Sequence, residues 1–192
     1  SFLSQLRAEL RSLRQSSRFR SDANDVCNPR QEAMYLPLAR DAEAVSLQGS
    51  CPASMQAVRQ MSGLAWELEQ DLGLQLAVPR AAMMSCYPPG ASYKMHLDSY
   101  ALQGDHEDVP RKVTILLYLS SGWTPAAGGE LRTWSAFDPG RGPCRTIAPL
   151  AGRLVIFMSE EIWHEVTESQ AERYALTLWV HDRARATIGE NK

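Results

Sequence analysis

The stretch YKMHLD at residues 93–98 places an imidazole and a carboxylate two positions apart among strand-forming neighbours. On a β-strand, residues i and i+2 point to the same face, so the side chains of His96 and Asp98 can converge on one point. Both side-chain types bind transition metals. Such a pair is also frequent by chance, so the hypothesis of a metal site needs a third ligand.

The chain has four histidines, at positions 96, 106, 164 and 181, which leaves few candidates for that ligand. His164 lies in the apolar run IWHEV, where an inward-facing polar side chain requires a partner. Two histidines and one carboxylate on a rigid barrel form the facial triad that holds non-haem Fe(II) and leaves coordination positions open. We therefore predict that His164 completes the site, whereas His106, among acidic neighbours in a polar loop, is expected to be solvated.

Arg173 follows His164 by nine residues, and the polar segment between them suits a hairpin turn. Strand alternation then sends Arg173 and Thr177 to one polar face. An arginine inside a barrel needs an anion, and its planar guanidinium suits a carboxylate with two parallel hydrogen bonds. That carboxylate could belong to a bound carboxylic acid, or to Glu130 or Glu165 on a neighbouring strand.

The elements that position these residues divide the chain in two. Leucines at helical spacing between residues 3 and 13 predict an amphipathic helix, and its arginine-rich face is expected to be solvated. A second helix is predicted from residue 52 or 53 to residue 71, with Gly73 at its C-terminal end. After Pro79 come seven short β-rich runs with turn signals between them, typical of a sandwich or barrel. The runs are AAMMSCY, KVTILLYL, GELRTW, CRTIA, RLVIF, IWHEV and RYALTLWVH.

Composition limits the classes of function. The chain has 192 residues, 44% of them hydrophobic, which is enough for a single domain with a full core. Its formal net charge of −2 gives no field that would recruit nucleic acid or an anionic membrane. We find no run of apolar residues long enough to span a bilayer and no signal-peptide pattern at the start. The four cysteines are scattered and are expected to be free thiols, which favours a reducing compartment. We expect the cytoplasm, with the nucleus as a second compartment. A monomer is the default expectation for the oligomeric state.

His96-x-Asp98, His164 and Arg173, followed by YALTLW, together resemble the Fe(II)- and 2-oxoglutarate-dependent oxygenases of the prolyl-hydroxylase group. More narrowly, the chain resembles the hypoxia-inducible-factor prolyl hydroxylases and their microbial and protist relatives, and arginine rather than lysine at 173 favours this branch over the collagen-type enzymes. The matching stretches cover residues 80–186 and are MMSCYPPGASYKMHLD, TILLYL, GGELRTW, RLVIFMSEEIWHEV, RYALTLW and DRARA.

The resemblance implies a mostly β fold with supporting helices, a double-stranded β-helix (a jelly-roll, cupin-like barrel) packed on N-terminal helices. It implies one domain over residues 1–192, with residues 1–79 as mainly helical support and lid segment and residues 80–186 as the barrel core. The loops expected within that core lie at residues 100–112 and 139–143.

The resemblance also implies roles for individual residues. His96, Asp98 and His164 would bind iron, and Arg173 would bind the distal carboxylate of 2-oxoglutarate. The other contacts to 2-oxoglutarate would come from Tyr118 and Thr177 at that carboxylate, Tyr87 at the other end, and Met83, Leu116 and Leu131 on the apolar wall. For each of the three wall residues, taken singly, ordinary core packing is the more common explanation.

Contacts to the substrate follow from the same resemblance. Trp179 matches the position where the pocket opens, and Arg111 matches a basic position in the family's peptide groove. Arg30, Gln31 and Glu32 fall where the family has Arg-Gly-Asp in a mobile loop that covers the site, so Arg30 and Glu32 are predicted to contact substrate. The loop sequence differs here, the segment before His96 is one residue shorter, and the sequence stops soon after DRARA, three differences that affect the choice of substrate.

The function implied is that of an oxidoreductase, a dioxygenase that hydroxylates a prolyl residue (a prolyl 4-hydroxylase) in a protein or peptide, in the manner of the oxygen-sensing enzymes. Fe(II) is the expected cofactor, 2-oxoglutarate and O2 are the expected co-substrates, ascorbate is a further candidate cofactor, and succinate and CO2 are the expected co-products. Two alternatives stay open. One is the same chemistry on a non-prolyl residue, a small molecule or a methylated base, and the other is a non-enzymatic metal-binding β-barrel used as a binding module.

Overall fold

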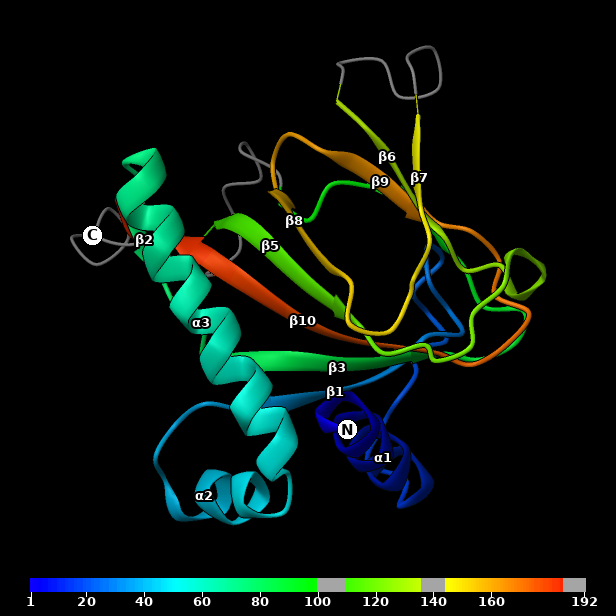
Figure 1. Cartoon of the computed structure of the whole chain (residues 1–192), viewed down its shortest axis with the longest axis horizontal. Coiled ribbons are helices and arrows are strands. Elements are labelled where there is room, and N and C mark those ends of the chain that lie inside the picture. Colours follow the sequence, from blue (N-terminus) through cyan, green and yellow to red (C-terminus); the bar gives the residue numbers. More distant parts are fainter. Residues whose placement is uncertain (100–109, 136–143, 185–192) are drawn as a thin grey trace.

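A computed structural model of the chain describes residues 1–99, 110–135 and 144–184. Two antiparallel β-sheets pack against each other, and helices from the N-terminal part cover the outer face of the larger sheet (Figure 1). This layered arrangement of sheets on N-terminal helices agrees with the predicted fold class. His106, the predicted loop at 139–143 and most of the predicted loop at 100–112 lie outside the described residues.

Three α-helices belong to the first part of the chain. They are α1 (Phe2–Gln15), α2 (Ala42–Gly49) and α3 (Pro52–Leu72). Helices α1 and α3 confirm the two predicted helices, and Gly73 ends α3 in the left-handed conformation, at a φ of 63°. Helix α2 was not predicted; its eight residues are too few for a clear periodic pattern, although the side chain of Asp41 caps its first turn.

The larger sheet has six strands in the order β1-β3-β10-β5-β8, with β2 paired to β10. The strands are β1 (Glu32–Pro37), β2 (Leu76–Ala77), β3 (Ala81–Tyr87), β5 (Arg111–Tyr118), β8 (Leu154–Met158) and β10 (Arg173–Asp182). Strand β1 lies within residues 1–79, which were expected to be mainly helical support and lid, and it was not predicted. Its buried residues Met34 and Leu36 alternate with the exposed Tyr35, and it pairs along its whole length with β3.

The smaller sheet has the order β4-β9-β6-β7. Its strands are β4 (Tyr93–His96), β6 (Leu131–Trp134), β7 (Arg145–Ile147) and β9 (Trp163–Val166). A short 3-10 helix, η1 (Pro125–Ala127), precedes β6. The register pairs His96 directly with His164, so the fold brings two of the predicted metal ligands onto adjacent strands.

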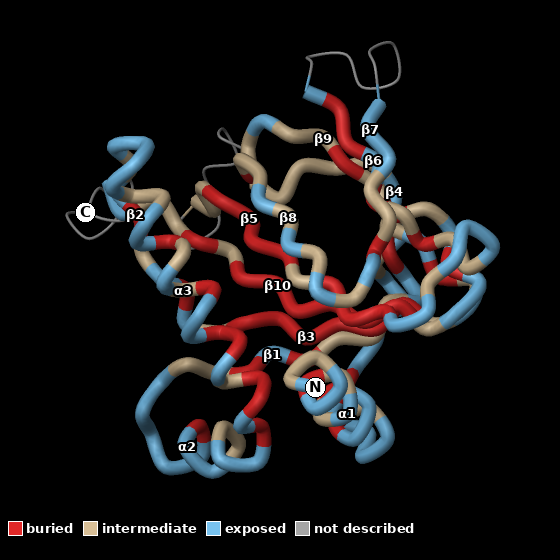
Figure 2. Tube along the Cα trace, viewed as in Figure 1, coloured by how far each residue is buried: buried red, intermediate tan, exposed pale blue. Residues whose placement is uncertain are grey.

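Strand β10 separates two apolar cores. In Figure 2, β3, β5 and β10 are largely red, which marks buried residues, and run through the middle of the molecule. Leu176, Leu178 and Val180 pack with α1 and α3 on the helical side. The alternate residues Arg173 and Thr177 face the space between the two sheets, as the predicted alternation requires. The core between the sheets is smaller and contributes apolar wall to the cavity that Arg173 lines.

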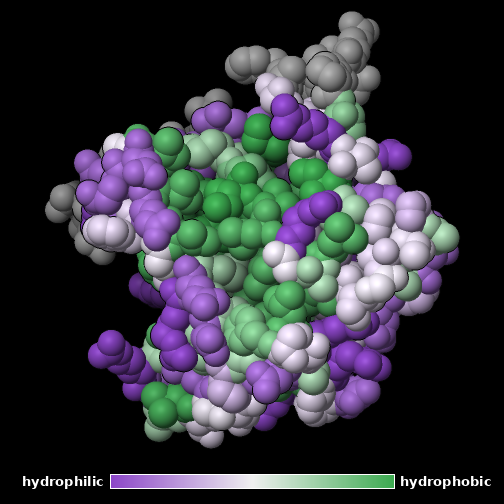
Figure 3. All heavy atoms as spheres, viewed as in Figure 1, coloured by the Kyte–Doolittle hydropathy of each residue, from purple (hydrophilic) through white to green (hydrophobic). Residues whose placement is uncertain are grey.

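The surface of the larger sheet is not completely covered. Hydrophobic side chains gather in the middle of the face shown in Figure 3, beside α3, and Leu154 and Ile156 of the edge strand β8 are 38% and 39% exposed. All four cysteines are free thiols. Among the described residues, we find no helix with the length and apolar character needed to cross a membrane.

Candidate metal centre

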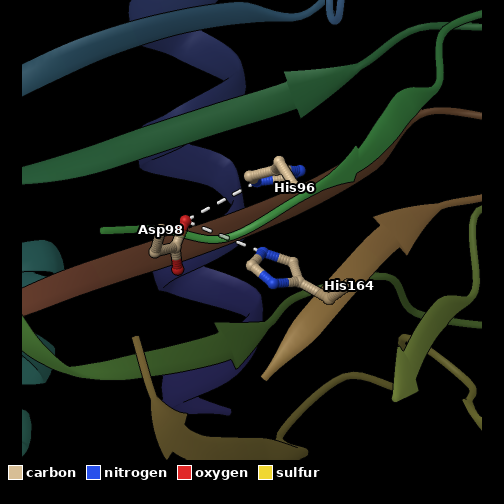
Figure 4. Close-up of side chains that lie close together, drawn as sticks. All are labelled: His96, Asp98 and His164. Atoms are coloured by element: carbon tan, nitrogen blue, oxygen red, sulfur yellow. Dashed lines mark ion pairs between the residues drawn. The ribbon is translucent and has the colours of Figure 1, made fainter. Parts of the chain in front are cut away.

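Three potential metal ligands converge between the two sheets (Figure 4). His96 ends β4, His164 lies on β9, and Asp98 follows β4 in a bend. Asp98 Oδ1 lies 3.6 Å from Nε2 of each histidine, and the three ligand atoms are within 4.8 Å of one another. The expectation that a continuous strand carries both His96 and Asp98 is wrong, because β4 ends at His96, but the turn out of the strand still directs the carboxylate to the same point.

Hydrogen bonds to the main chain set the orientation of both imidazoles. The Nδ1 of His96 lies 2.8 Å from the Lys94 carbonyl oxygen, and the Nδ1 of His164 lies 3.0 Å from that of Ile162. A carbonyl oxygen only accepts, so Nδ1 carries a proton in each ring, and in a neutral ring Nε2 keeps its lone pair. Both lone pairs face the carboxylate of Asp98, an arrangement of three acceptors that a cation between them would stabilise.

Asp98 is held by hydroxyl groups on its other oxygen. Thr114 donates to Asp98 Oδ2 over 2.6 Å, and the hydroxyls of Thr114 and Ser159 are 2.9 Å apart. Burial by itself would raise the pKa of the Asp98 carboxyl, but the interactions with His96, His164 and Thr114 outweigh it and lower that pKa to about 2.

Burial lowers the pKa of His164, and the Asp98 carboxylate only partly opposes this shift. Near neutral pH the site therefore combines a neutral imidazole at His164 with an ionised carboxylate at Asp98. These are the protonation states in which both groups bind a divalent metal. The donor set of two nitrogens and one oxygen fits non-haem iron.

A cavity of about 240 Å³ extends from this triad to Arg173. Arg173 is only 4% exposed, and its Nε donates to the carbonyl oxygen of Gly129 over 2.8 Å. Its guanidinium carbon lies 4.8 Å from the ring centres of both Tyr87 and Tyr118. The hydroxyl of Tyr118 is buried and, within the described part of the chain, has no hydrogen-bond partner.

No carboxylate of residues 1–99, 110–135 or 144–184 pairs with Arg173. Glu130 accepts from Thr167 over 2.6 Å, and Glu165 pairs with Arg132 over 3.3 Å. The alternative in which a neighbouring glutamate neutralises Arg173 is therefore wrong. A buried guanidinium without an internal anion, next to a buried hydroxyl without a partner, fits a carboxylate ligand.

Gly129 is a requirement of this arrangement that the sequence analysis missed. Its φ is 73°, and a Cβ at this position would lie 2.5 Å from Ser169 Oγ and 3.0 Å from Arg173 Cδ. Only glycine lets the main chain approach Arg173 closely enough to accept its hydrogen bond. The adjacent glycines in GGELRTW were the available signal.

Most of the other predicted site residues reach the cavity. Its lining includes Met83, Tyr87, Leu116, Leu131, Thr177, Trp179 and Arg111. Tyr118 lies next to the cavity, against Arg173. Beside Asp98, the guanidinium of Arg111 stacks 3.9 Å from the ring centre of Trp179 and donates to the Asp98 carbonyl oxygen over 3.3 Å.

Arg30 and Glu32, by contrast, are not among the residues that line the cavity. Arg30 donates weakly to the Gly90 carbonyl oxygen over 3.4 Å, and the carboxylate of Glu32 pairs with Arg14 over 2.6 Å. Arg14 also pairs with Glu172 over 2.5 Å. This part of the α1 surface was expected to be solvated, and that expectation is wrong for Arg14. The role of Arg30 and Glu32 in substrate binding stays a prediction.

Several lining residues have no counterpart in the sequence analysis. They are Asp25, Tyr35, Ser85 and Phe157, and Gln31 was named only as part of the loop expected to cover the site, with no contact assigned to it. Thr114 was missed too, although strand alternation places it on the same face of β5 as Leu116 and Tyr118, and that parity could have identified it. Asp25 and Gln31 come from an irregular segment, where no periodic pattern points to a facing side.

Comparison with known proteins gives matches over the part of the chain that contains the triad and Arg173. The family model described as the 2OG-Fe(II) oxygenase superfamily matches residues 82–181. Egl nine homolog 1 of Rattus norvegicus is 37% identical over 113 residues, which cover 56% of this chain and 31% of that protein. The match therefore spans about a third of the length of that relative.

Two solved structures are similar over nearly the whole chain. A prolyl-4-hydroxylase from Pseudomonas putida is 28% identical, with a TM-score of 0.75 over 95% of this chain and 87% of that chain. A prolyl hydroxylase from Trichoplax adhaerens, solved with a hypoxia inducible factor oxygen degradation domain peptide fragment, is 26% identical, with a TM-score of 0.71 over 97% and 81%. These similarities confirm the predicted fold and the resemblance drawn from the sequence.

Proposed function

The chain belongs to the 2OG-Fe(II) oxygenase superfamily, and from this premise we propose that it hydroxylates a prolyl residue of a protein or peptide. The observation that carries the proposal is the combination, in one cavity, of a His-Asp-His triad with a buried arginine that pairs with no carboxylate of the described residues. The triad suits Fe(II), and the arginine suits the far carboxylate of 2-oxoglutarate.

When bound, Fe(II) and 2-oxoglutarate supply the oxidising chemistry: O2 is consumed, 2-oxoglutarate loses CO2 to become succinate, and one oxygen atom is inserted into the substrate. The protein would contribute His96, Asp98 and His164 as ligands. Because main-chain carbonyls hold both Nδ1–H groups, each Nε2 lone pair is already directed before metal arrives. Thr114 holds the carboxylate so that Asp98 Oδ1 faces the two histidines.

Arg173 would hold the distal carboxylate of 2-oxoglutarate. Its Nε is used by the Gly129 carbonyl, which leaves the two terminal nitrogens of the guanidinium to donate. The Tyr118 hydroxyl supplies one further donor, and Thr177 lies four residues along β10 from Arg173 on the same face. The ring of Tyr87 also lies against this guanidinium, with its centre 4.8 Å from the guanidinium carbon.

The remaining wall would control access. Met83, Leu116 and Leu131 present apolar side chains to the cavity, which keeps water away from the reacting groups. Arg111 and Trp179 form a stacked pair beside Asp98, and we assign them to orienting the substrate at the mouth.

The prolyl specificity of the proposal comes from the relatives. The curated matches include Egl nine homolog 1 and proteins named prolyl hydroxylase EGLN3, and the two similar structures are a prolyl-4-hydroxylase and a prolyl hydroxylase with a bound peptide. The peptide in the Trichoplax complex supports a peptide substrate for this chain.

The test is mass spectrometry of a pool of short peptides with one central proline, which includes the hypoxia inducible factor fragment. The pool is incubated with Fe(II), 2-oxoglutarate and O2, and we expect one added oxygen at proline together with equimolar succinate. The matched controls are the Asp98→Ala variant and the same peptides with alanine in place of proline.

Succinate formation without added oxygen on any proline would contradict the prolyl assignment but keep the oxygenase. Oxygen added at another residue would shift the assignment to that residue. Equal activity of wild type and Asp98→Ala would contradict the proposed catalytic site itself.

A further inference from the structure

Strand β8 (Leu154–Met158) ends the larger sheet, and only one of its two edges is paired. The paired edge bonds to β5 along the whole strand. The Ser159 N–H donates to the Lys112 carbonyl over 3.0 Å, which fixes the residues whose main-chain groups point toward β5. By the alternation of an antiparallel ladder, these are residues 153, 155, 157 and 159. The main-chain groups of Leu154 and Ile156 therefore point away from the sheet.

The free edge of β8 has no strand against it in the described part of the chain. Within residues 1–99, 110–135 and 144–184, no main-chain hydrogen bond uses the N–H or C=O of Leu154 or Ile156. Their side chains are 38% and 39% exposed. Figure 3 shows hydrophobic side chains gathered over the part of the molecule where Figure 1 draws β5 and β8. The edge thus offers unpaired peptide groups beside exposed apolar side chains.

Three other edge strands carry features that prevent pairing with a further strand. On β1, the N–H and C=O of Ala33 bond to Arg20, and the strand ends at Pro37. On β4, the Lys94 N–H donates to the Cys27 carbonyl over 3.0 Å, and β7 has only three residues. Strand β8 reads LVIFM, without charge or proline. An exposed apolar edge of this kind is a template for pairing with another strand.

The charges at the two ends of β8 favour a second copy of the same strand. Arg153 precedes the strand, and Glu160 and Glu161 follow it. Glu160 pairs with Lys112 on β5 over 3.9 Å, and Glu161 is exposed. When two such strands run antiparallel, the arginine of each copy meets the acidic end of the other. A parallel pair would set like charges side by side, which is destabilising.

We propose that two copies of the chain associate through β8, antiparallel and about a twofold axis at Ile156, so that the two larger sheets become one continuous sheet. In this register Ile156 lies opposite its counterpart, and Leu154 lies opposite Met158 of the second copy. The two Ile156 residues exchange a pair of main-chain hydrogen bonds, and the apolar side chains form cross-strand pairs. Such a contact uses the same surface on both copies and closes at a dimer. The inference replaces the default expectation of a monomer and does not depend on the proposed function.

The first test is sedimentation-velocity ultracentrifugation of the full chain from low to high micromolar concentration. We expect a concentration-dependent equilibrium between monomer and dimer. Ile156→Lys should weaken the dimer at least about tenfold, because it places like charges directly opposite each other at the twofold axis. Val78→Lys is the matched control, since it adds the same charge at a side chain that is 50% exposed outside β8, and it should dimerise like wild type.

A second pair of variants tests the main-chain hydrogen bonds. The Ile156 N–H points to the free edge, so Ile156→Pro removes no bond within the subunit, whereas Ile156→Ala keeps that N–H. We expect the dimer to be weaker for Ile156→Pro than for Ile156→Ala, with both variants folded by circular dichroism. Hydrogen exchange of the wild type needs no substitution, and the amides of Leu154 and Ile156 should exchange more slowly as protein concentration rises.

An exchange of charges tests the antiparallel direction. Arg153→Glu should weaken the dimer about three- to tenfold, because it sets acidic groups of the two copies against each other. Combining Arg153→Glu with Glu161→Arg should restore the dimer, since opposite charges again meet across the contact.

The outcomes decide the proposal. A wild-type protein that stays monomeric at high micromolar concentration would overturn it. A dimer of wild-type affinity in both Ile156→Lys and Ile156→Pro would also overturn it, because the contact would then lie on another surface. Assembly beyond a dimer would contradict the closed twofold contact.

Discussion

The metal end of the cavity and the loop of residues 20–33, here called the roof loop, whose Asp25 and Gln31 line the same cavity, are built in different ways. At the metal end, paired strands bring His96 opposite His164, and main-chain carbonyls and the Thr114 hydroxyl orient the ligands. In the roof loop, two buried amide atoms have no partner within the described part of the chain.

This difference separates chemistry from selection. A reaction that generates a strong oxidant needs its ligands placed before the metal arrives, and strand register with hydrogen-bonded neighbours provides that. Selection of a substrate needs groups that become satisfied only when the right partner binds. Substitutions at the metal end should accordingly impair turnover and ligand affinity, whereas substitutions in the roof loop should raise the KM for peptide. The expected effects are given from the largest to the smallest.

Loss of a metal ligand should give the largest effect. Asp98→Ala is expected to lower iron-dependent succinate formation by more than about 100-fold, because even the partners of a metal ligand are worth 10–100-fold. The variant should still fold, since it removes one of three converging acceptors rather than core volume. Metal content and succinate yield measure the effect. Wild-type turnover in this variant would contradict the assignment of Asp98 as a metal ligand and with it the distinction drawn between the two ends.

Arg173→Ala should come next. We expect about 100-fold weaker binding of 2-oxoglutarate, because charge-assisted hydrogen bonds to the carboxylate are lost, while iron affinity is retained. Anaerobic calorimetry of each ligand measures the two affinities separately. Arg173→Lys is the matched control and should be intermediate, since lysine keeps the charge but not the planar fork. Unchanged 2-oxoglutarate affinity would refute the assignment of Arg173.

Thr114→Val tests whether the Thr114 hydroxyl, which donates to Asp98, contributes to metal binding. Valine keeps the shape and removes the donor to Asp98 Oδ2, so we expect metal affinity to fall about tenfold. Ser159→Ala should have a smaller effect, because Ser159 reaches Asp98 only through Thr114. Equal metal affinities in wild type and Thr114→Val would show that the ligand is held by the fold alone.

The smallest effect is expected at the roof loop. Asp25 Oδ1 accepts from the N–H groups of Cys27 and Asn28 over 2.9 and 3.1 Å, which fixes the position of Asn28. Asp25→Ala should raise the KM for peptide about two- to tenfold and leave iron and 2-oxoglutarate affinities unchanged. A loss of metal affinity in this variant would contradict the separation of the two ends.

The metal end was largely predictable from the sequence. Its residue types are few, and among the four histidines of the chain the place of His164 in an apolar run indicated the third ligand. Strand alternation also placed Arg173 and Thr177 on one face, which the structure confirms. The exit of Asp98 from β4 was not predictable, because a bend that redirects a side chain has no periodic signature.

The structure of β1 and of the roof loop was much less predictable from the sequence. The edge strand β1 is short and ends in proline, so its pattern is weak. Asp25 and Gln31 reach the cavity through loop hydrogen bonds between residues distant in sequence, such as Lys94 to Cys27. Glu32 was expected near the substrate, but Arg14 on α1 holds its carboxylate, a pairing that depends on how α1 docks.

The measurement that tests the central claim most directly is an anaerobic titration of the purified protein with Fe(II) and then 2-oxoglutarate. The account predicts the weak visible charge-transfer band of an iron-chelated keto acid in wild type. It predicts no such band in a folded His96→Ala variant. A wild-type protein that is folded by circular dichroism and shows no band would contradict the account.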